Sequence, residues 1–288
     1  MSPRIPCAVL ACLLFAACGS SSNSTGPATA TATPEPSVTV TVFAAASLAK
    51  VMPMEIAAFQ AKHPTITVTG DYEGTQALLT KLQADGSLAD VFVSADKAHM
   101  DTAQTKGIVA TPHTMATNAL VIALPPGNPG HVSGLADLAR SGLKMSIADK
   151  SVPAGNYAEQ AFAIAESNHD VPAGFAKAAL ANVATRPTDV ETVVTNVAAG
   201  VVDAGIVYAT DARSSTAITS LPIAQRDQPL TQYVLAVTVK AGAARAAQEF
   251  TDFLLSDAGQ QILRAAGFGS PGPTAQPLGG GGPATPTP

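Results

Sequence analysis

The chain has 288 residues, of which 47% are hydrophobic, 13% charged and 5% aromatic, and its formal net charge is −5. This apolar content suffices for one or two hydrophobic cores, and the acidic balance without a basic stripe argues against nucleic acid as a partner. All three cysteines fall within the first 18 residues, which excludes a disulfide framework, a cysteine nucleophile and a cysteine-ligated metal from the rest of the chain.

The first 17 residues predict an export signal that is not part of the fold. Arg4 precedes the apolar run IPCAVLACLLFAA, which is too short to cross a membrane as a helix. The following FAAC resembles a bacterial lipobox, so we expect Cys18 to be lipidated and the protein to be anchored outside the cytoplasm at the cell membrane. Cys12, which follows VLA, is a second candidate for lipidation, and plain secretion with cleavage nearby is the alternative.

Two segments are predicted to be disordered. Residues 18–37 are rich in Ser, Thr, Ala and Pro, with no apolar face, as expected of a flexible tether after the lipidated cysteine. Residues 269–288 contain six glycines and six prolines. The folded part is therefore expected to span residues 38–268.

Strand-like apolar runs alternate with helical patterns through this folded part. The expected strands are 37–43, 66–72, 89–95, 116–125, 143–149, 204–210 and 232–239, and the expected helices are 48–63, 75–84, 97–107, 153–167, 189–200 and 244–268. Such alternation predicts parallel or mixed sheets with helices on both faces. A chain of this length favours two lobes, which we expect at residues 38–115 plus 233–268 and at residues 116–232.

Small or hydroxyl-bearing residues stand where predicted strands meet predicted helices. Ser47 follows three alanines, Thr75 follows a glycine, SVPAG occupies 151–155, and residues 188–191 form a T-x-x-E capping-box pattern. Helix starts present unpaired N–H donors and the positive end of the helix dipole. Each hydroxyl alone is explained as a helix N-cap, but four such junctions together predict a cradle for an anion that needs no Lys or Arg.

Five motifs carry a resemblance to a known family. FAAASL (43–48), ADVFVSAD (89–96), SVPAGNYA (151–158), DV (189–190) and GIVYATDA (205–212) resemble, in order and spacing, the periplasmic molybdate-binding protein family of ABC importers. The resemblance covers residues 38–268. It implies an α/β, two-lobed periplasmic-binding-protein-like fold (type II), with mixed sheets flanked by helices and a ligand cleft between the lobes.

The resemblance also implies a ligand set. Carried over by position, lobe one would supply the hydroxyls of Ser47 and Thr75. Lobe two would supply the backbone N–H groups of Ala154 and Val190 and the phenol of Tyr208. The family commonly has serine at the position of Thr75, and Glu73 is unexpected so close to a dianion, so we expect its side chain to point away.

A site made only of donors suits molybdate, which at neutral pH is a dianion with four acceptor oxygens and no proton. Phosphate keeps a proton at this pH and needs an acceptor as well. We therefore expect a monomeric binding protein that captures molybdate, and tungstate too, and delivers it to the membrane permease of an ABC importer. It would be no enzyme and would need no cofactor, with molybdenum present only as the bound oxyanion.

Two alternatives stay open. The same fold could bind sulfate or another oxyanion, because the sequence does not reveal the volume of the pocket. An extracytoplasmic hydrolase with Ser47 as nucleophile is the second, but no histidine lies close to Ser47 in sequence and the G-x-S-x-G motif is absent. The five histidines lack metal-ligand spacing, and Asp189 is most simply a partner of a helix dipole.

Overall fold

The computed structural model describes residues 37–84 and 89–272. The predicted export signal, Cys18, the tether up to residue 36 and the tail from residue 273 lie outside the described residues. Within the described part of the chain, no helix combines the length and the apolar character needed to span a bilayer.

The first sheet is mixed, with strand order β2-β1-β3-β10-β4. Its strands are β1 (Val38–Ala45), β2 (Ile66–Glu73), β3 (Val91–Ser94), β4 (His113–Asn118) and β10 (Thr231–Val237). Strand β1 pairs in parallel with β2 and β3, whereas β10 runs antiparallel to β3 and β4. The β-branched run at the start of β1 favours a strand, and Val40, Val42 and Ala44 are fully buried in the core.

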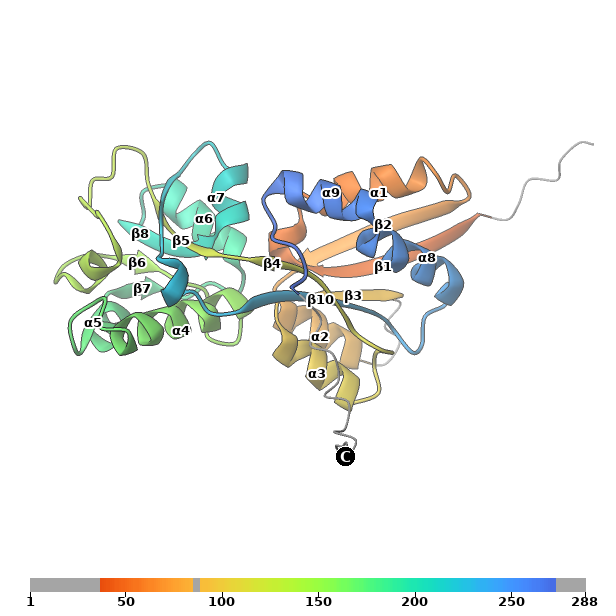
Figure 1. Ribbon diagram of the computed structural model, residues 1–288, viewed down its shortest axis with the longest axis horizontal. Coiled ribbons are helices and arrows are strands. Elements are labelled where there is room, and N and C mark those ends of the chain that lie inside the picture. The colour runs from red at the N-terminus through yellow and green to blue at the C-terminus, as the bar shows by residue number, and fades with distance from the viewer. Residues whose placement is uncertain (1–36, 85–88, 273–288) are drawn as a thin grey trace, which may run out of the picture. The chain divides into compact units, whose positions relative to one another are not determined.

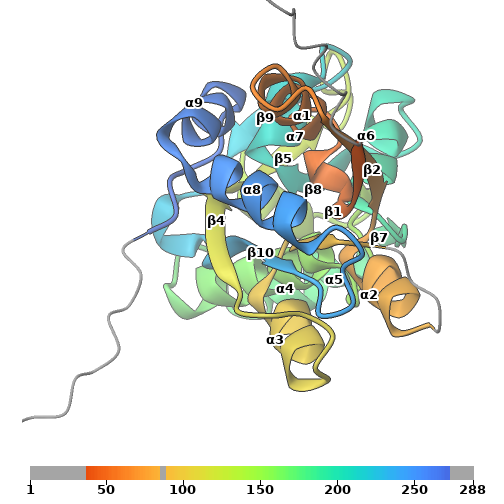
Figure 2. The same cartoon turned by 90° about the vertical axis from the view of Figure 1, so that its right-hand side faces the viewer.

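Helices cover both faces of this sheet, as Figures 1 and 2 show. One face carries α1 (Met52–Gln60), α8 (Ala244–Leu255) and α9 (Asp257–Ala266), and the other carries α2 (Thr75–Gln83) and α3 (Lys97–Thr105). Each face has its own apolar cluster, one around Phe59 and Phe250 and one around Leu78 and Met100. A single turn of 3-10 helix, η1 (Ala46–Leu48), directly follows β1.

The second sheet has strand order β7-β6-β8-β5-β9. Its strands are β5 (Leu120–Leu124), β6 (Met145–Ser146), β7 (Val183–Thr185), β8 (Ala204–Tyr208) and β9 (Thr219–Pro222). Its helices are α4 (Pro153–Ser167), α5 (Phe175–Ala181), α6 (Val190–Ala198) and α7 (Ala209–Ser214), with 3-10 turns η2 (Leu135–Ala139) and η3 (Gln225–Asp227). Helices α4 and α5 lie on one face and α6 and α7 on the other (Figure 1). The predicted fold class, two mixed α/β lobes, is confirmed.

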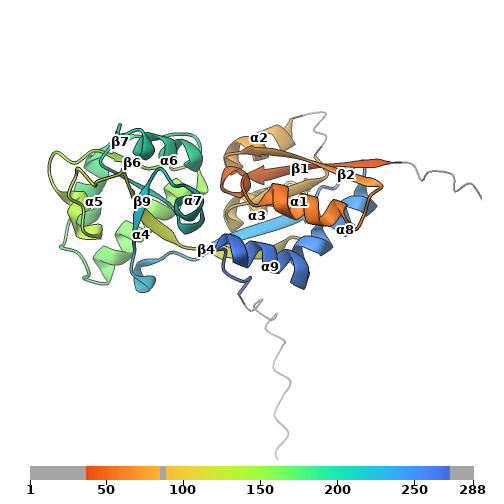
Figure 3. The same cartoon turned by 90° about the horizontal axis from the view of Figure 1, so that it is seen from above.

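The chain passes between the sheets at two neighbouring places. Strand β4 belongs to the first sheet and β5 to the second, and β10 brings the chain back (Figures 1 and 3). The prediction of one strand over 116–125 was therefore wrong. The strand breaks at Ala119, whose N–H donates to the side-chain oxygen of Asn118 and whose carbonyl accepts from the N–H of Ala209.

The structure also differs from the prediction in the length of one strand and in where lobe one ends. The helix expected over 153–167 is confirmed, but the strand expected over 143–149 is reduced to Met145–Ser146. At the C-terminal end, Gly269 exchanges two backbone hydrogen bonds with Thr117. The ordered chain of lobe one therefore reaches at least to Gly269.

Candidate functional site

A small cleft lies where η1 and the start of α2 face the starts of α4 and α6. It is lined by Ala45, Ala46, Ser47, Gly74, Thr75, Ala95, Val152, Pro153, Ala154, Val190 and Tyr208. The five residues singled out in the sequence are all in this lining, contributed by both lobes. Its cavity volume is about 10 Å³, far below the roughly 300–1,000 Å³ usual for organic ligands, so the cleft has no room for such a ligand.

Lobe one contributes two hydroxyl groups. Ser47 lies within η1, directly after β1, and its Oγ is 2.8 Å from the hydroxyl of Tyr233. Thr75 is the first residue of α2, and its Oγ1 accepts a hydrogen bond from the N–H of Ala95 at 3.2 Å. Neither hydroxyl caps a helix, so the simple N-cap explanation does not apply to them. The Thr75 hydroxyl donates to no other group among the described residues, so its proton is available to an acceptor in the cleft.

Helix α4 contributes a backbone donor from lobe two. Pro153 occupies the first helical position, where its missing N–H leaves no bond unmade. Ala154 follows, and the N–H of a second helical residue has no partner within the helix. Gly155 allows this helix start to lie against the preceding backbone, because a Cβ there would be 2.2 Å from the carbonyl oxygen of Asp149.

Helix α6 begins differently from the prediction. Its N-cap is Asp189, whose carboxylate accepts from the N–H of Thr192 at 2.7 Å, so the capping box predicted with Thr188 as N-cap was wrong. With Asp189 as the N-cap, the helix starts one residue later than the predicted capping box implies. The N–H of Val190, the first helical residue, has no partner within the helix. The Asp189 carboxylate also accepts from the Thr192 hydroxyl, which places the acid in a capping role.

Tyr208 ends β8 with a buried hydroxyl. The side chain is 1% exposed, and its Oη has no hydrogen-bond partner among the described residues. Burial raises the pKa of Tyr208 well above its usual value, so the phenol stays protonated and remains a donor. A buried, unpaired hydroxyl is unfavourable, which indicates that an acceptor belongs in the cleft.

The lining contains no charged side chain, and the nearby acids have other partners. Glu73 pairs with Lys81 at 2.6 Å and so points away, as expected from the sequence. Asp211 is buried and accepts from the N–H of Tyr208 at 3.1 Å. Burial raises the pKa of Asp211 well above its usual value, which favours its neutral form.

Three contacts cross the cleft and hold it closed. Gln76 Nε2 donates to the carbonyl oxygen of Thr188 at 2.7 Å. Lys50 Nζ donates to Ser214 Oγ at 3.0 Å and lies 3.6 Å from the carboxylate of Glu191. Polar side chains of lobe one therefore contact polar groups of lobe two beside the candidate site.

Tyr233 and Asn118 were not predicted as site residues from the sequence. Tyr233 lies on β10, fully buried, with its ring centroid 5.8 Å from that of Tyr208. Asn118 ends β4, and its Nδ2 is 3.4 Å from the Tyr233 hydroxyl. Neither residue lines the cleft, and no local motif marks them, because strand pairing alone brings them together.

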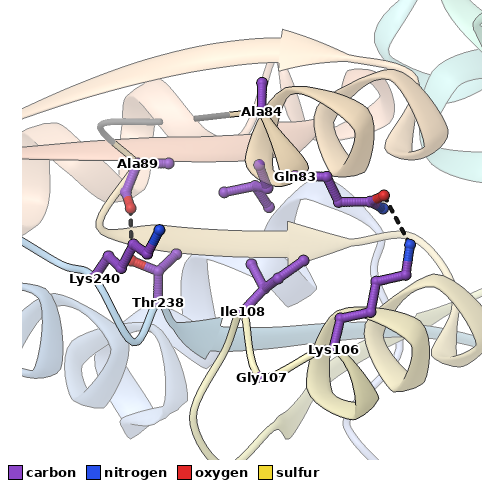
Figure 4. A pocket seen from close by; sticks show the side chains of 9 residues that line it. Gln83, Ala84, Ala89, Lys106, Gly107, Ile108, Thr238 and Lys240 are labelled. Carbon is purple, nitrogen blue, oxygen red and sulfur yellow. Dashed lines mark hydrogen bonds between the residues drawn. The ribbon is translucent and has the colours of Figure 1, made fainter. Parts of the chain in front are cut away.

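A larger hollow lies elsewhere in lobe one, beside the ends of α2 and α3 (Figure 4). Lys106 Nζ donates to Gln83 Oε1 at 2.8 Å, and Thr238 Oγ1 donates to the carbonyl of Ala89 at 2.6 Å. These polar groups satisfy one another, in contrast to the free hydroxyl of Tyr208, and none of the residues predicted from the sequence lines this hollow.

Converging donors in an uncharged cleft between two α/β lobes define a solute-binding protein for a small anion. Residues 40–269 match the sequence profile of the bacterial extracellular solute-binding proteins. The chain is 33% identical over 231 residues to the molybdate-binding protein ModA of Mycobacterium tuberculosis, a match that covers 80% of this chain and 84% of that one. The chain belongs to the periplasmic molybdate-binding protein family.

Two further proteins extend the comparison. The putative ABC transporter substrate-binding lipoprotein YvgL of Bacillus subtilis is 28% identical over 265 residues, covering 91% of this chain and 95% of that one. The solved structure of the sulfate-binding protein SubI of M. tuberculosis superposes with a TM-score of 0.70 at 20% identity, covering 82% of this chain and 88% of that one. This last likeness concerns the fold alone.

Proposed function

We propose that this protein binds molybdate, and tungstate equally, and delivers it to the membrane permease of an ABC importer. The observation that carries the proposal is the buried hydroxyl of Tyr208, which has no partner among the described residues and lines the same small cleft as the other donors. Ser47 and Thr75 donate through their hydroxyls, Ala154 and Val190 through their backbone N–H groups, and Tyr208 through its phenol.

The chemistry of the donors selects the ligand. Each hydrogen bond to a charged group contributes roughly 1.5–3 kcal/mol, so five donors can offset the desolvation of a dianion without any cationic side chain. Molybdate and tungstate have four acceptor oxygens, the same charge and similar size, so both satisfy the whole set. The ModA relative supports this assignment by its identity over most of the chain.

Two other functions have less support. Sulfate carries the same charge, and a sulfate-binding protein shares the fold. Sulfate is smaller, however, and would leave some donors of a closed cleft without a hydrogen bond. A hydrolase would need a general base beside Ser47. The Ser47 hydroxyl instead bonds to the hydroxyl of Tyr233, whose pKa burial raises far above the usual value, so that group is a poor base. The proposed role is binding without catalysis or a cofactor.

The proposed location is outside the cytoplasm, at the cell membrane, with the monomer anchored through a lipid on Cys18. The FAAC motif supports this, as does the similarity to a protein named as a lipoprotein. Intact mass spectrometry of the mature protein should find acylated Cys18 at the N-terminus, and Cys18→Ser should release the protein from membranes. An unmodified Cys18 or cleavage at another site would refute the anchor.

Thermal melts with four anions test the ligand. A ligand that binds only the folded protein raises its melting temperature in proportion to the logarithm of its concentration over Kd. At one concentration, molybdate and tungstate should give the largest and nearly equal shifts, sulfate a smaller one and phosphate the smallest. A larger shift with sulfate or phosphate would refute the molybdate assignment and leave the fold unaffected.

A further inference from the structure

Ser47 is the last member of a chain of hydrogen bonds that begins at the crossing between the lobes. Asn118 Nδ2 lies 3.4 Å from Tyr233 Oη, and Tyr233 Oη lies 2.8 Å from Ser47 Oγ. Ser47 in turn lines the cleft. The donor and the acceptor at each link decide whether Ser47 offers the cleft a proton or a lone pair.

The side-chain amide of Asn118 has a fixed orientation. Its Oδ1 accepts from the backbone N–H of Ala119 at 2.9 Å, and a backbone N–H can only donate. Its Nδ2 donates to the Thr210 hydroxyl at 2.8 Å. Rotating the amide by half a turn would set two donors against each other at Ala119, so the nitrogen faces Tyr233.

The direction of the remaining links follows. Because Nδ2 can only donate, the Tyr233 oxygen accepts from Asn118. Of the two groups that the Tyr233 hydroxyl contacts, only the Ser47 oxygen can accept its proton, and an unpaired buried proton would be unfavourable, so the Tyr233 proton goes to Ser47. The Ser47 oxygen then accepts from Tyr233, so the Ser47 proton is free to donate to an acceptor in the cleft. Burial raises the pKa of Tyr233, so this proton is present throughout the physiological pH range.

The surroundings hold Asn118 and Tyr233 in place. The Thr231 hydroxyl donates to the Asn118 carbonyl and accepts from the Asn118 N–H at 3.0 Å. The Tyr233 ring packs edge-on against Phe268 at 5.3 Å. It also lies where the pairing of β10 with β4 shifts register, between Tyr233 and Val234. Local bulges of this kind re-aim side chains, and here the hydroxyl is aimed at Ser47.

We propose that Tyr233 and Asn118 are positioning residues that fix Ser47 as a hydrogen-bond donor and thereby set the selectivity of the cleft for unprotonated over protonated oxyanions. The inference rests on the proposed function, because it concerns the same anion site. An anion without a proton gains from a fixed donor. A protonated anion needs an acceptor, and a Ser47 oxygen that already accepts from Tyr233 is a weaker second acceptor than an unbonded one, because hydrogen bonds in a chain polarise one another.

Titration calorimetry of molybdate, sulfate and phosphate with Tyr233→Phe tests this inference. The ring packing is kept, and only the link to Ser47 is lost. The ratio of molybdate to phosphate affinity should fall about tenfold, the size of one ordinary hydrogen bond, while the ratio of molybdate to sulfate affinity stays constant. Tyr72→Phe is the matched control, since Tyr72 is half-buried on β2 and does not line the cleft. It should change neither ratio.

Asn118→Asp provides a second variant. A carboxylate accepts from Tyr233, which reverses the links and leaves Ser47 donating to Tyr233, with a lone pair toward the cleft. At pH 8, where phosphate is mainly the protonated dianion HPO4²⁻, the added charge repels all three dianions alike, so it cancels in the affinity ratios. The molybdate-to-phosphate ratio should fall further than in Tyr233→Phe.

A double variant separates positioning from packing. In a Ser47→Ala background the Tyr233 hydroxyl has no serine oxygen to donate to, so adding Tyr233→Phe should leave the molybdate-to-phosphate affinity ratio unchanged. Three results would each overturn the inference. The molybdate-to-phosphate affinity ratio could stay unchanged in Tyr233→Phe, the molybdate-to-sulfate ratio could fall along with it, or the full fall could appear in the Ser47→Ala background. Absence of molybdate binding by the parent protein would instead refute the proposed function, on which the inference depends.

Discussion

Tyr208→Phe should change stability and binding in opposite directions. The substitution removes one hydroxyl whose oxygen is buried and lacks a partner among the described residues. An unsatisfied buried polar group costs about 1–3 kcal/mol. The free energy of unfolding of the ligand-free variant should therefore rise by up to this amount, which corresponds to about 2–4 °C in melting temperature per kcal/mol for a domain of this size.

The same hydroxyl would bond a charged oxygen in the complex, so its loss should weaken molybdate binding. Such a bond contributes roughly 1.5–3 kcal/mol, which is about 10- to 150-fold in Kd. Denaturant unfolding without ligand measures the first effect, and titration calorimetry measures the second. Tyr72→Phe, which deletes a hydroxyl outside the cleft, serves as the control for both.

The two results together decide the reasoning. If the ligand-free variant is more stable than the parent and binds molybdate more weakly, the Tyr208 hydroxyl is a hydrogen-bond donor to the anion. A variant that loses stability when empty and binds molybdate as tightly as the parent would refute this account of Tyr208. It would mean that the hydroxyl stabilises the fold and makes no contact with the ligand.

Three further predictions concern one buried acid and two contacts across the cleft. Glu55 is fully buried, its carboxylate oxygens lack partners among the described residues, and burial raises its pKa from 4.5 to about 8. Glu55 should therefore lower the free energy of unfolding as pH rises from about 4.5 to about 8, and Glu55→Gln should reduce the loss of stability between pH 5 and pH 8 in denaturant melts. The buried Asp211, whose pKa is also raised, keeps its own contribution, and an identical slope in the variant would contradict the assignment. Gly74→Ala would place a Cβ 2.4 Å from the carbonyl oxygen of Thr188 across the cleft, so it should obstruct closure and weaken molybdate binding at least tenfold in calorimetry, an expectation that fails if Kd is unchanged. Gln76→Ala removes only the hydrogen bond to Thr188 and should weaken binding by about 0.5–1.5 kcal/mol, mainly through a faster off-rate in stopped-flow displacement; a slower on-rate alone would argue against a closing contact.

Local signals in the sequence were sufficient for several elements. The helix over 153–167 is marked by a proline at its first position and by apolar spacing along its length, and the structure confirms it. The prediction of one strand over 116–125 was wrong because both parts are extended and joined by the single residue Ala119, so no turn residue marks the change of sheet. Side-chain and backbone bonds at Asn118 and Ala209 decide that break, and they depend on the tertiary structure.

The candidate site was only partly accessible from sequence. The five predicted ligand residues came from the family resemblance, and all five line the cleft, while their roles as ligands remain proposals. Thr188 was chosen as a cap because T-x-x-E is a good pattern, but Asp189 competes one residue later with a stronger acceptor. Tyr233 and Asn118 lie 115 positions apart, and only the pairing of β4 with β10 joins them.

Anomalous X-ray scattering at the molybdenum absorption edge, from crystals grown with molybdate, tests the central claim most directly. The account predicts one strong molybdenum peak per chain in the cleft, with oxygens about 2.7–3.2 Å from Ser47 Oγ, Ala154 N and Tyr208 Oη. An empty cleft at saturating molybdate, or molybdenum found only on the surface away from these groups, would contradict it.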